Sequence, residues 1–235
     1  MENVWKARLP RINEPAPDFT ARTTHGMRSL ADYRGKWLVL FSHPADFTPV
    51  CTTEFVAFAR AHDRFSALGC ELLGLSVDST YSHIAWVRNI EEKFGVRIPF
   101  PIIEDLSMQV AHDYGMIQPG ASDTSAVRAT FLIDPEGRVR AMVYYPMANG
   151  RSVDELLRLL AALQTSDAHG VSTPEGWRPG DKVIVPPPAT QQDAAARAKA
   201  GYEYTDWYFA KTDLRRAGAK GAGKAARPGR RRAKG

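Results

Sequence analysis

The chain has 235 residues, of which 44% are hydrophobic, so it can bury one sizeable core and carry an appendage. Its two cysteines are too few for a disulfide framework, and we expect neither a secretory leader nor a membrane span, which favours the cytoplasm. The formal net charge of +5 is misleading, because residues 215–235 hold nine Lys or Arg and no acid. Removing those nine from the 31 basic residues leaves 22 against 26 acidic ones, so the rest of the chain is mildly acidic.

The first half of the chain alternates apolar runs with segments of helical periodicity. Residues 37–43 predict a buried strand, residues 49–67 a helix and residues 71–77 a second buried strand. Strand, helix and strand in this order predict that the two strands are parallel.

The elements expected after them alternate in the same way. They are a helix from Ser79 or Thr80 to Gly95, an extended segment over 99–103, a helix near 108–114, two strands over 127–133 and 138–144 around a turn at 134–137, and a helix that follows a capping box of Ser152 and Glu155. This order predicts an α/β fold, in which a mixed sheet of the thioredoxin-like plan is flanked by helices on both faces.

Three segments are expected along the chain: a body over 1–164, a C-terminal arm over 165–214 and a basic tail over 215–235. The arm is rich in Pro and Gly, with a short helix near 190–200, and then dense in aromatic residues over 202–209. Such an apolar stretch is expected to pack on the body or on a neighbouring subunit. The tail has no apolar periodicity and is expected to be disordered.

One cysteine lies where the first predicted strand turns into a helix. Thr48 is placed as the N-cap, Pro49 as the first helical residue and Cys51 in the first turn. Backbone N–H groups there lack helical partners and carry the positive end of the helix dipole. The position therefore favours a reactive thiolate. A buried structural cysteine is the alternative.

The order Pro-x-x-x-Thr-x-x-Cys, formed by Pro44, Thr48 and Cys51, matches the active-site signature of the peroxiredoxins. Further blocks stand in that family's order: 76–79, 128–134, 145–151 and 177–181. Over roughly residues 5 to 210 the chain resembles the one-cysteine branch of that family, whose members carry a C-terminal arm.

The resemblance implies a thiol peroxidase for antioxidant defence. In that family the cysteine at the place of Cys51 attacks hydrogen peroxide or an organic hydroperoxide and becomes a sulfenic acid. The threonine at Thr48 contacts the sulfur and the peroxide, and the proline at Pro44 shields the thiolate. From the residues alone, Thr48 is a helix cap and Pro44 ends a strand.

Four more residues are candidates for the site. Arg128 lies in an apolar strand, so it needs an anion, either the thiolate and peroxide or a carboxylate such as Glu54. The family assigns both, with Glu54 holding Arg128. Arg151 matches the family's second arginine but could be a solvated loop residue. His43 matches the histidine of the one-cysteine branch, although a lone histidine is more often structural.

Cys70 is not expected to form a disulfide with Cys51. The intervening helix of some 18 residues spans ~27 Å, whereas a disulfide needs Cα atoms within about 7 Å. Cys70 opens a buried strand and is expected to fill the core. Relatives of similar length carry cysteines in the arm where this chain has Tyr204 and Ala210, so an external thiol or another small reductant is implied.

Two other functions compete with the peroxidase. A thioredoxin-like disulfide oxidoreductase needs Cys-x-x-Cys, which the sequence lacks, and no spacing indicates a metal or a cofactor. The tail over 215–235 could bind nucleic acid or another anionic surface, or be a solubilising extension. Relatives with this arm form dimers that associate into rings, often decamers, so a homo-oligomer is implied.

Overall fold

The computed structural model describes residues 9–122 and 124–214, which belong to two compact units that divide after Leu157. The division falls inside helix α5 (Val153–His169), the same helix that contains the predicted boundary after residue 164. The tail expected to be disordered lies outside the described residues. In the part of the chain that is described, no helix has both the length and the apolar character that crossing a membrane requires.

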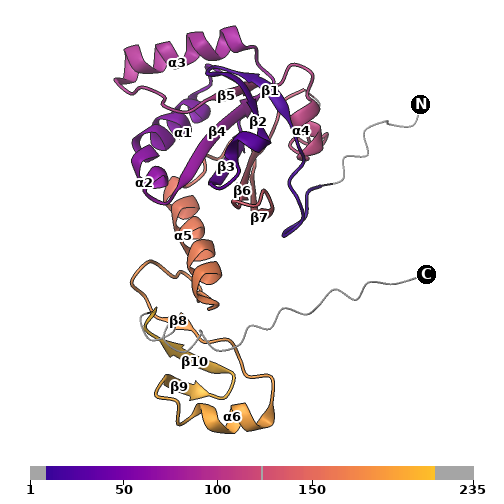
Figure 1. Ribbon diagram of the computed structural model, residues 1–235. Coiled ribbons are helices and arrows are strands. Elements are labelled where there is room, and N and C mark those ends of the chain that lie inside the picture. The colour runs from indigo at the N-terminus through magenta and orange to yellow at the C-terminus, as the bar shows by residue number, and fades with distance from the viewer. Residues whose placement is uncertain (1–8, 123, 215–235) are drawn as a thin grey trace, which may run out of the picture. The chain divides into compact units, whose positions relative to one another are not determined.

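The first unit is built on a seven-stranded sheet in the order β2-β1-β5-β4-β3-β6-β7 (Figure 1). Strands β3, β4 and β5 are parallel, and β6 joins β3 antiparallel, so the sheet is mixed as predicted. The strands are β1 (Thr20–Thr23), β2 (Gly26–Ser29), β3 (Trp37–Ser42), β4 (Cys70–Ser76), β5 (Ile102–Glu104), β6 (Arg128–Ile133) and β7 (Val139–Tyr145).

Helices cover both faces of this sheet. They are a 3-10 helix η1 (Leu30–Tyr33), α1 (Pro49–Arg60), α2 (His62–Ala67), α3 (Thr80–Phe94) and α4 (Gln109–Asp113). Residues of η1 and α4 belong to one hydrophobic cluster, whereas α1 packs its phenylalanines on the opposite face. The α/β fold with flanking helices is confirmed.

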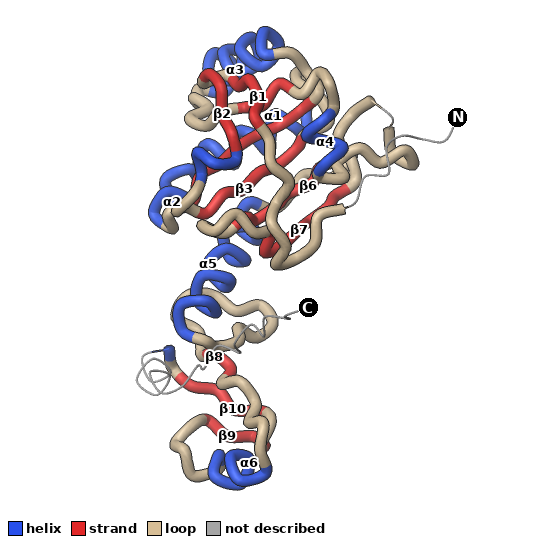
Figure 2. The backbone as a smooth tube through the Cα atoms, turned by 45° about the vertical axis from the view of Figure 1, so that its right-hand side comes forward, coloured by secondary structure: helices blue, strands red, loops and turns tan. Residues whose placement is uncertain are grey.

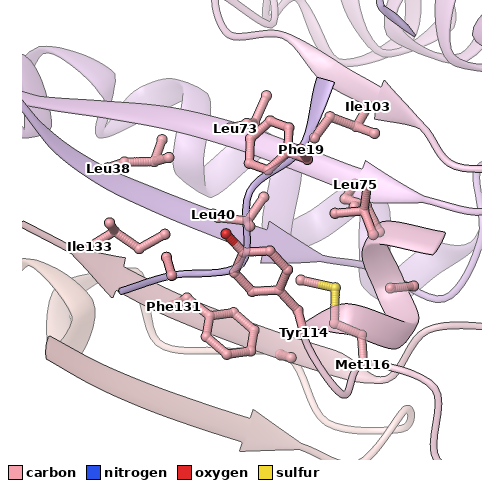
Figure 3. Close-up of a cluster of buried hydrophobic side chains, with 14 of the residues drawn as sticks. Phe19, Leu38, Leu40, Leu73, Leu75, Ile103, Tyr114, Met116, Phe131 and Ile133 are labelled. Atoms are coloured by element: carbon pink, nitrogen blue, oxygen red, sulfur yellow. The ribbon is translucent and has the colours of Figure 1, made fainter. Parts of the chain in front are cut away.

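Alternation along the central strands decides what each face carries. Leu38 and Leu40 of β3 join Phe131 of β6 in the cluster of buried side chains that Figure 3 shows. Successive side chains of a strand point to opposite faces, so Phe41 of β3 and Arg128 of β6 face the other way. Phe41 stacks on α1 there, and Arg128 is therefore turned toward the same helix.

Two local features differ from the sequence prediction. The helix expected over 49–67 is interrupted at Ala61, where the backbone has φ −93° and ψ −1° and the amide is shared between the carbonyls of Ala57 and Phe58. The hairpin of β1 and β2 was not predicted, because each strand has only four residues and little buried surface to give it an apolar pattern. The parallel pairing of β3 with β4 and the antiparallel hairpin of β6 with β7 are confirmed.

The second unit contains a three-stranded sheet in the order β8-β10-β9 (Figure 2). Its strands are β8 (Val183–Ile184), β9 (Glu203–Asp206) and β10 (Phe209–Thr212), and its helix α6 (Gln191–Arg197) is capped by Thr190. The short helix is confirmed. The aromatic segment forms the β9–β10 hairpin, with Tyr204, Trp207 and Tyr208 exposed.

Candidate active site

The loop between β3 and α1 places Cys51 in the first turn of α1, where its side chain is fully buried. Phe47 has the left-handed φ of 56°, which turns the chain before Thr48 resumes an extended conformation at the N-cap. Thr48 stands at the predicted cap, but its side chain makes no capping bond. Its hydroxyl donates to the carbonyl of Ala45 at 2.8 Å.

Arg128 reaches the cysteine from the neighbouring strand β6. Its Nη1 lies 3.4 Å from the Cys51 Sγ and 2.6 Å from Oε2 of Glu54. Its Nε donates to the carbonyl of Met147 at 2.8 Å, which fixes the plane of the guanidinium. The sulfur of Cys51 and the carboxylate of Glu54 therefore both contact the same nitrogen of Arg128.

Glu54, one turn along α1 from Cys51, also binds Arg151. Its Oε1 accepts the amide and Nε of Arg151 at 2.7 and 2.9 Å, and its Oε2 accepts Nη2 at 2.7 Å. The Arg151 guanidinium lies over the rings of Phe41 and Phe58, and its side chain has no exposed surface. The interpretation of Arg151 as a solvated loop residue is wrong.

The charges of this buried group do not cancel without the cysteine. Arg128 and Arg151 are two cations that share the single carboxylate of Glu54, which leaves one positive charge. Burial alone would raise the pKa of Glu54, but the hydrogen bonds and charge of Arg151, with the charge of Arg128, hold it below its usual range. A thiolate at Cys51 would bring the group to neutrality.

A second polar group lies beside the first. His43 Nε2 is 2.9 Å from Oδ1 of Asp46, and Asp46 Oδ2 is 2.8 Å from Nδ1 of His83. These three are the group of possible metal ligands found among the described residues. Each of those ligand atoms already takes part in a hydrogen bond, so the arrangement is explained without an ion.

Sequence reasoning missed two of these residues. Asp46 lies inside the motif but was given no role, and His83 of α3 carries no local signal because its partner is 37 residues away. Pro44 is half-buried in the loop after β3. Cys70 begins β4 and is buried, which raises the pKa of its thiol to about 12, and both cysteines are free.

Comparison with known proteins agrees with this geometry. Residues 12–142 match the model of the AhpC/TSA family, and residues 162–201 match the C-terminal domain of 1-Cys peroxiredoxin. A peroxiredoxin of Aquifex aeolicus is 56% identical over 214 residues, which cover 86% of this chain and 96% of the relative. One of Methanosarcina mazei is 49% identical with the same coverage.

Solved structures give the same result. A yeast mitochondrial 1-Cys peroxiredoxin, described with the glutathione and thioredoxin systems, has a TM-score of 0.77 and 41% identity, covering 87% of this chain and all of that one. A variant of peroxiredoxin 6 from Arenicola marina has a TM-score of 0.75 and 32% identity, covering 86% of this chain and 97% of that one.

A thioredoxin-like sheet with a cysteine at the start of a helix, held against a buried arginine, defines a thiol peroxidase. The chain belongs to the AhpC/TSA family of peroxiredoxins. It is an oxidoreductase that reduces peroxides with electrons from thiols, and the alternative of a dithiol oxidoreductase is set aside.

The Glu54→Gln variant should lose part of the acid sensitivity of stability. The folded pKa of Glu54 is depressed, so the folded chain binds fewer protons than the unfolded one, whose Glu side chains titrate near pH 4.3. Its stabilising contribution is complete above that pH and is lost as the pH falls toward the folded pKa. At neutral pH the variant should be less stable by roughly 3–5 kcal/mol, because two buried cations lose their anion.

Urea unfolding between about pH 7 and pH 3 measures both effects. The control is Glu92→Gln, since the Glu92 side chain is 68% exposed and should change little. Identical pH slopes for the wild-type chain and Glu54→Gln would contradict the assigned role of Glu54.

Proposed function

We propose that Cys51 is the nucleophile that reduces hydrogen peroxide and organic hydroperoxides. The thiolate sulfur attacks the terminal peroxide oxygen, an S–O bond forms as the O–O bond breaks, and sulfur is oxidised by two electrons to sulfenic acid. The leaving oxygen takes a proton and departs as water or an alcohol. The 3.4 Å contact between Arg128 Nη1 and the Sγ, inside a buried group with one unbalanced positive charge, is the observation that carries this proposal.

The other site residues then have separate tasks. Arg128 stabilises the thiolate and the negative charge that develops on the leaving oxygen. Glu54 holds Arg128 and Arg151 in place, so it orients the site through the two guanidinium groups. Thr48 and Pro44 lie in the loop before α1, and in this proposal Thr48 directs the peroxide and Pro44 limits access of water.

The electrons that restore Cys51 come from outside the chain. Cys70 is buried at the start of β4 with a strongly raised pKa, so it is a poor thiolate for resolving the sulfenic acid. An external thiol condenses with the sulfenic acid to a mixed disulfide and water, and a second thiol releases Cys51. Such donors fit a cytoplasmic setting.

Replacement of Cys51 by serine should abolish peroxide turnover with a fold that is intact by circular dichroism, whereas Cys70→Ser should keep most activity. Turnover is measured with a panel of thiol donors. Under excess peroxide, intact-mass spectra should show the mass of added oxygen atoms as sulfenic and then sulfinic acid form. Substantial turnover by Cys51→Ser, or an intrachain disulfide as the main product, would overturn the mechanism.

We further propose that the arm joins two or more chains into a homo-oligomer, a dimer or a ring such as a decamer. The support is the exposed aromatic hairpin, in which Tyr204, Trp207 and Tyr208 are 40%, 48% and 55% exposed. Sedimentation at micromolar concentration should give at least a dimer, and Trp207→Ser should weaken it more than Lys199→Ser. A monodisperse wild-type monomer would contradict the proposal.

A second candidate function rests on the composition of residues 215–235, and we propose that this tail binds nucleic acid or a similar polyanion. Nine basic residues without an acid favour it. Truncation after Leu214 should leave peroxide turnover unchanged and remove retardation of DNA or RNA at low salt. If all nine basic residues contact phosphates, the logarithm of the binding constant should fall with the logarithm of the salt concentration with a slope of about −8, which is the steepest slope expected. Equal binding by both forms would refute it.

A further inference from the structure

His83 is a fully buried histidine with no role in the chemistry proposed above. It lies in the first turns of α3, and its Nε2 is 3.0 Å from the carbonyl oxygen of Ile103 in β5. A carbonyl oxygen can only accept a hydrogen bond, so this nitrogen must carry a proton. The ring is therefore anchored to the sheet on one side and faces Asp46 with its other nitrogen.

The carboxylate of Asp46 joins this ring to His43. Its two oxygens are used separately, one toward His83 Nδ1 and one toward His43 Nε2. Burial would raise the pKa of Asp46, but the hydrogen bonds from both histidines hold it well below its usual range. An ionised carboxylate accepts only, so each histidine donates to it.

A hydrogen bond from its own backbone amide fixes the position of Asp46. Its amide donates to Oδ2 of Asp78 at 3.0 Å, and that carboxylate also accepts from the hydroxyl of Ser76 at the end of β4. Asp46 is thus held by its amide, through Asp78, to the end of β4, and by its carboxylate, through His83, to α3 and β5.

These linked hydrogen bonds determine the tautomer of His43. A proton on Nε2 leaves Nδ1 with a lone pair, and Nδ1 is buried with no hydrogen-bond partner among the described residues. Burial lowers the pKa of His43, which favours the neutral ring. The ring packs on Phe55 with centroids 4.8 Å apart. Phe55 follows Cys51 by one helical turn, so both lie on one face of α1.

We propose that His83 is a positioning residue that acts through Asp46 to hold His43 with an unprotonated Nδ1 against the face of α1 that carries Cys51. The lone pair accepts the proton of the Cys51 thiol as the thiolate forms, and the ring returns that proton to the leaving oxygen when the O–O bond breaks. A ring of the other tautomer would present an N–H instead and could not accept it. The proposal depends on the role of Cys51 proposed above, and its test separates the two.

Two substitutions of His83 each keep one of its two hydrogen bonds and remove the other. The amide nitrogen of His83→Asn stands near the place of Nδ1 and keeps the donor to Asp46, whereas that of His83→Gln stands near Nε2 and keeps only the donor to Ile103. Single-turnover oxidation by hydrogen peroxide can be followed by fluorescence of Trp86, whose ring centroid is 5.1 Å from that of His43. His83→Gln should react roughly 10- to 100-fold more slowly, and His83→Asn within roughly threefold of wild type.

Nitrogen NMR of the histidine rings supplies a readout that packing alone would not move. In the wild-type protein, His43 should carry its ring proton on Nε2 alone, and this expectation can be checked without any variant. His83→Gln should shift His43 toward a mixture of tautomers. Ile90→Ala is the packing control, since Ile90 is fully buried in the same helix and carries no polar group.

The control should lower stability but leave the oxidation rate and the His43 signals unchanged. A wild-type His43 protonated at Nδ1, or a His83→Gln protein that reacts at the wild-type rate, would overturn the positioning role. An equal slowing by Ile90→Ala would also overturn it. Turnover that survives in Cys51→Ser would instead remove the proposed function, so the two failures are distinct.

Discussion

The carboxylate of Glu54, buried between two guanidinium groups, is the constraint on which the active site depends. It is the single anion that the two arginines share, and it comes from the helix that also carries Cys51. Arg128 enters from β6 and Arg151 from the segment before α5, so one side chain of α1 binds two other elements. Because buried cations must be paired, these elements cannot separate without leaving a charge unpaired in an apolar environment.

The sheet makes this arrangement possible through strict alternation. The cluster that contains Leu40 and Phe131 fixes the register of β3 against β6, with Leu40 opposite Phe131. The same register turns Arg128 toward α1. A slip of one residue would bury Arg128 in the apolar cluster and turn Phe131 toward α1, so packing on the far side of the sheet specifies the side on which Arg128 meets Cys51.

Local patterns predicted much of this structure. The place of Cys51 at a helix start, the parallel pair β3–β4 and the hairpin β6–β7 follow from residues close in sequence. Contacts between distant residues could not be predicted in the same way. The burial of Arg151 depends on Glu54, 97 residues away, and the role of His83 depends on Asp46. The helix is interrupted at Ala61 without a Pro or Gly at that position, so the sequence carries no local signal for the break.

The two buried carboxylates of the site follow one physical rule. Glu54 and Asp46 each accept hydrogen bonds from two side chains, at least one of them from a distant element, and in each the pKa is held below its usual range despite burial. Glu54 contacts Arg128, whose Nη1 lies 3.4 Å from the Cys51 sulfur, and Asp46 contacts the ring of His43. An ionised carboxylate close to a thiolate would repel it, whereas one placed behind a cation or a neutral ring sets orientation without that cost. Arg128 thus links the Glu54 carboxylate to the sulfur, and a cation in that place would favour a negative charge on a side chain that is fully buried.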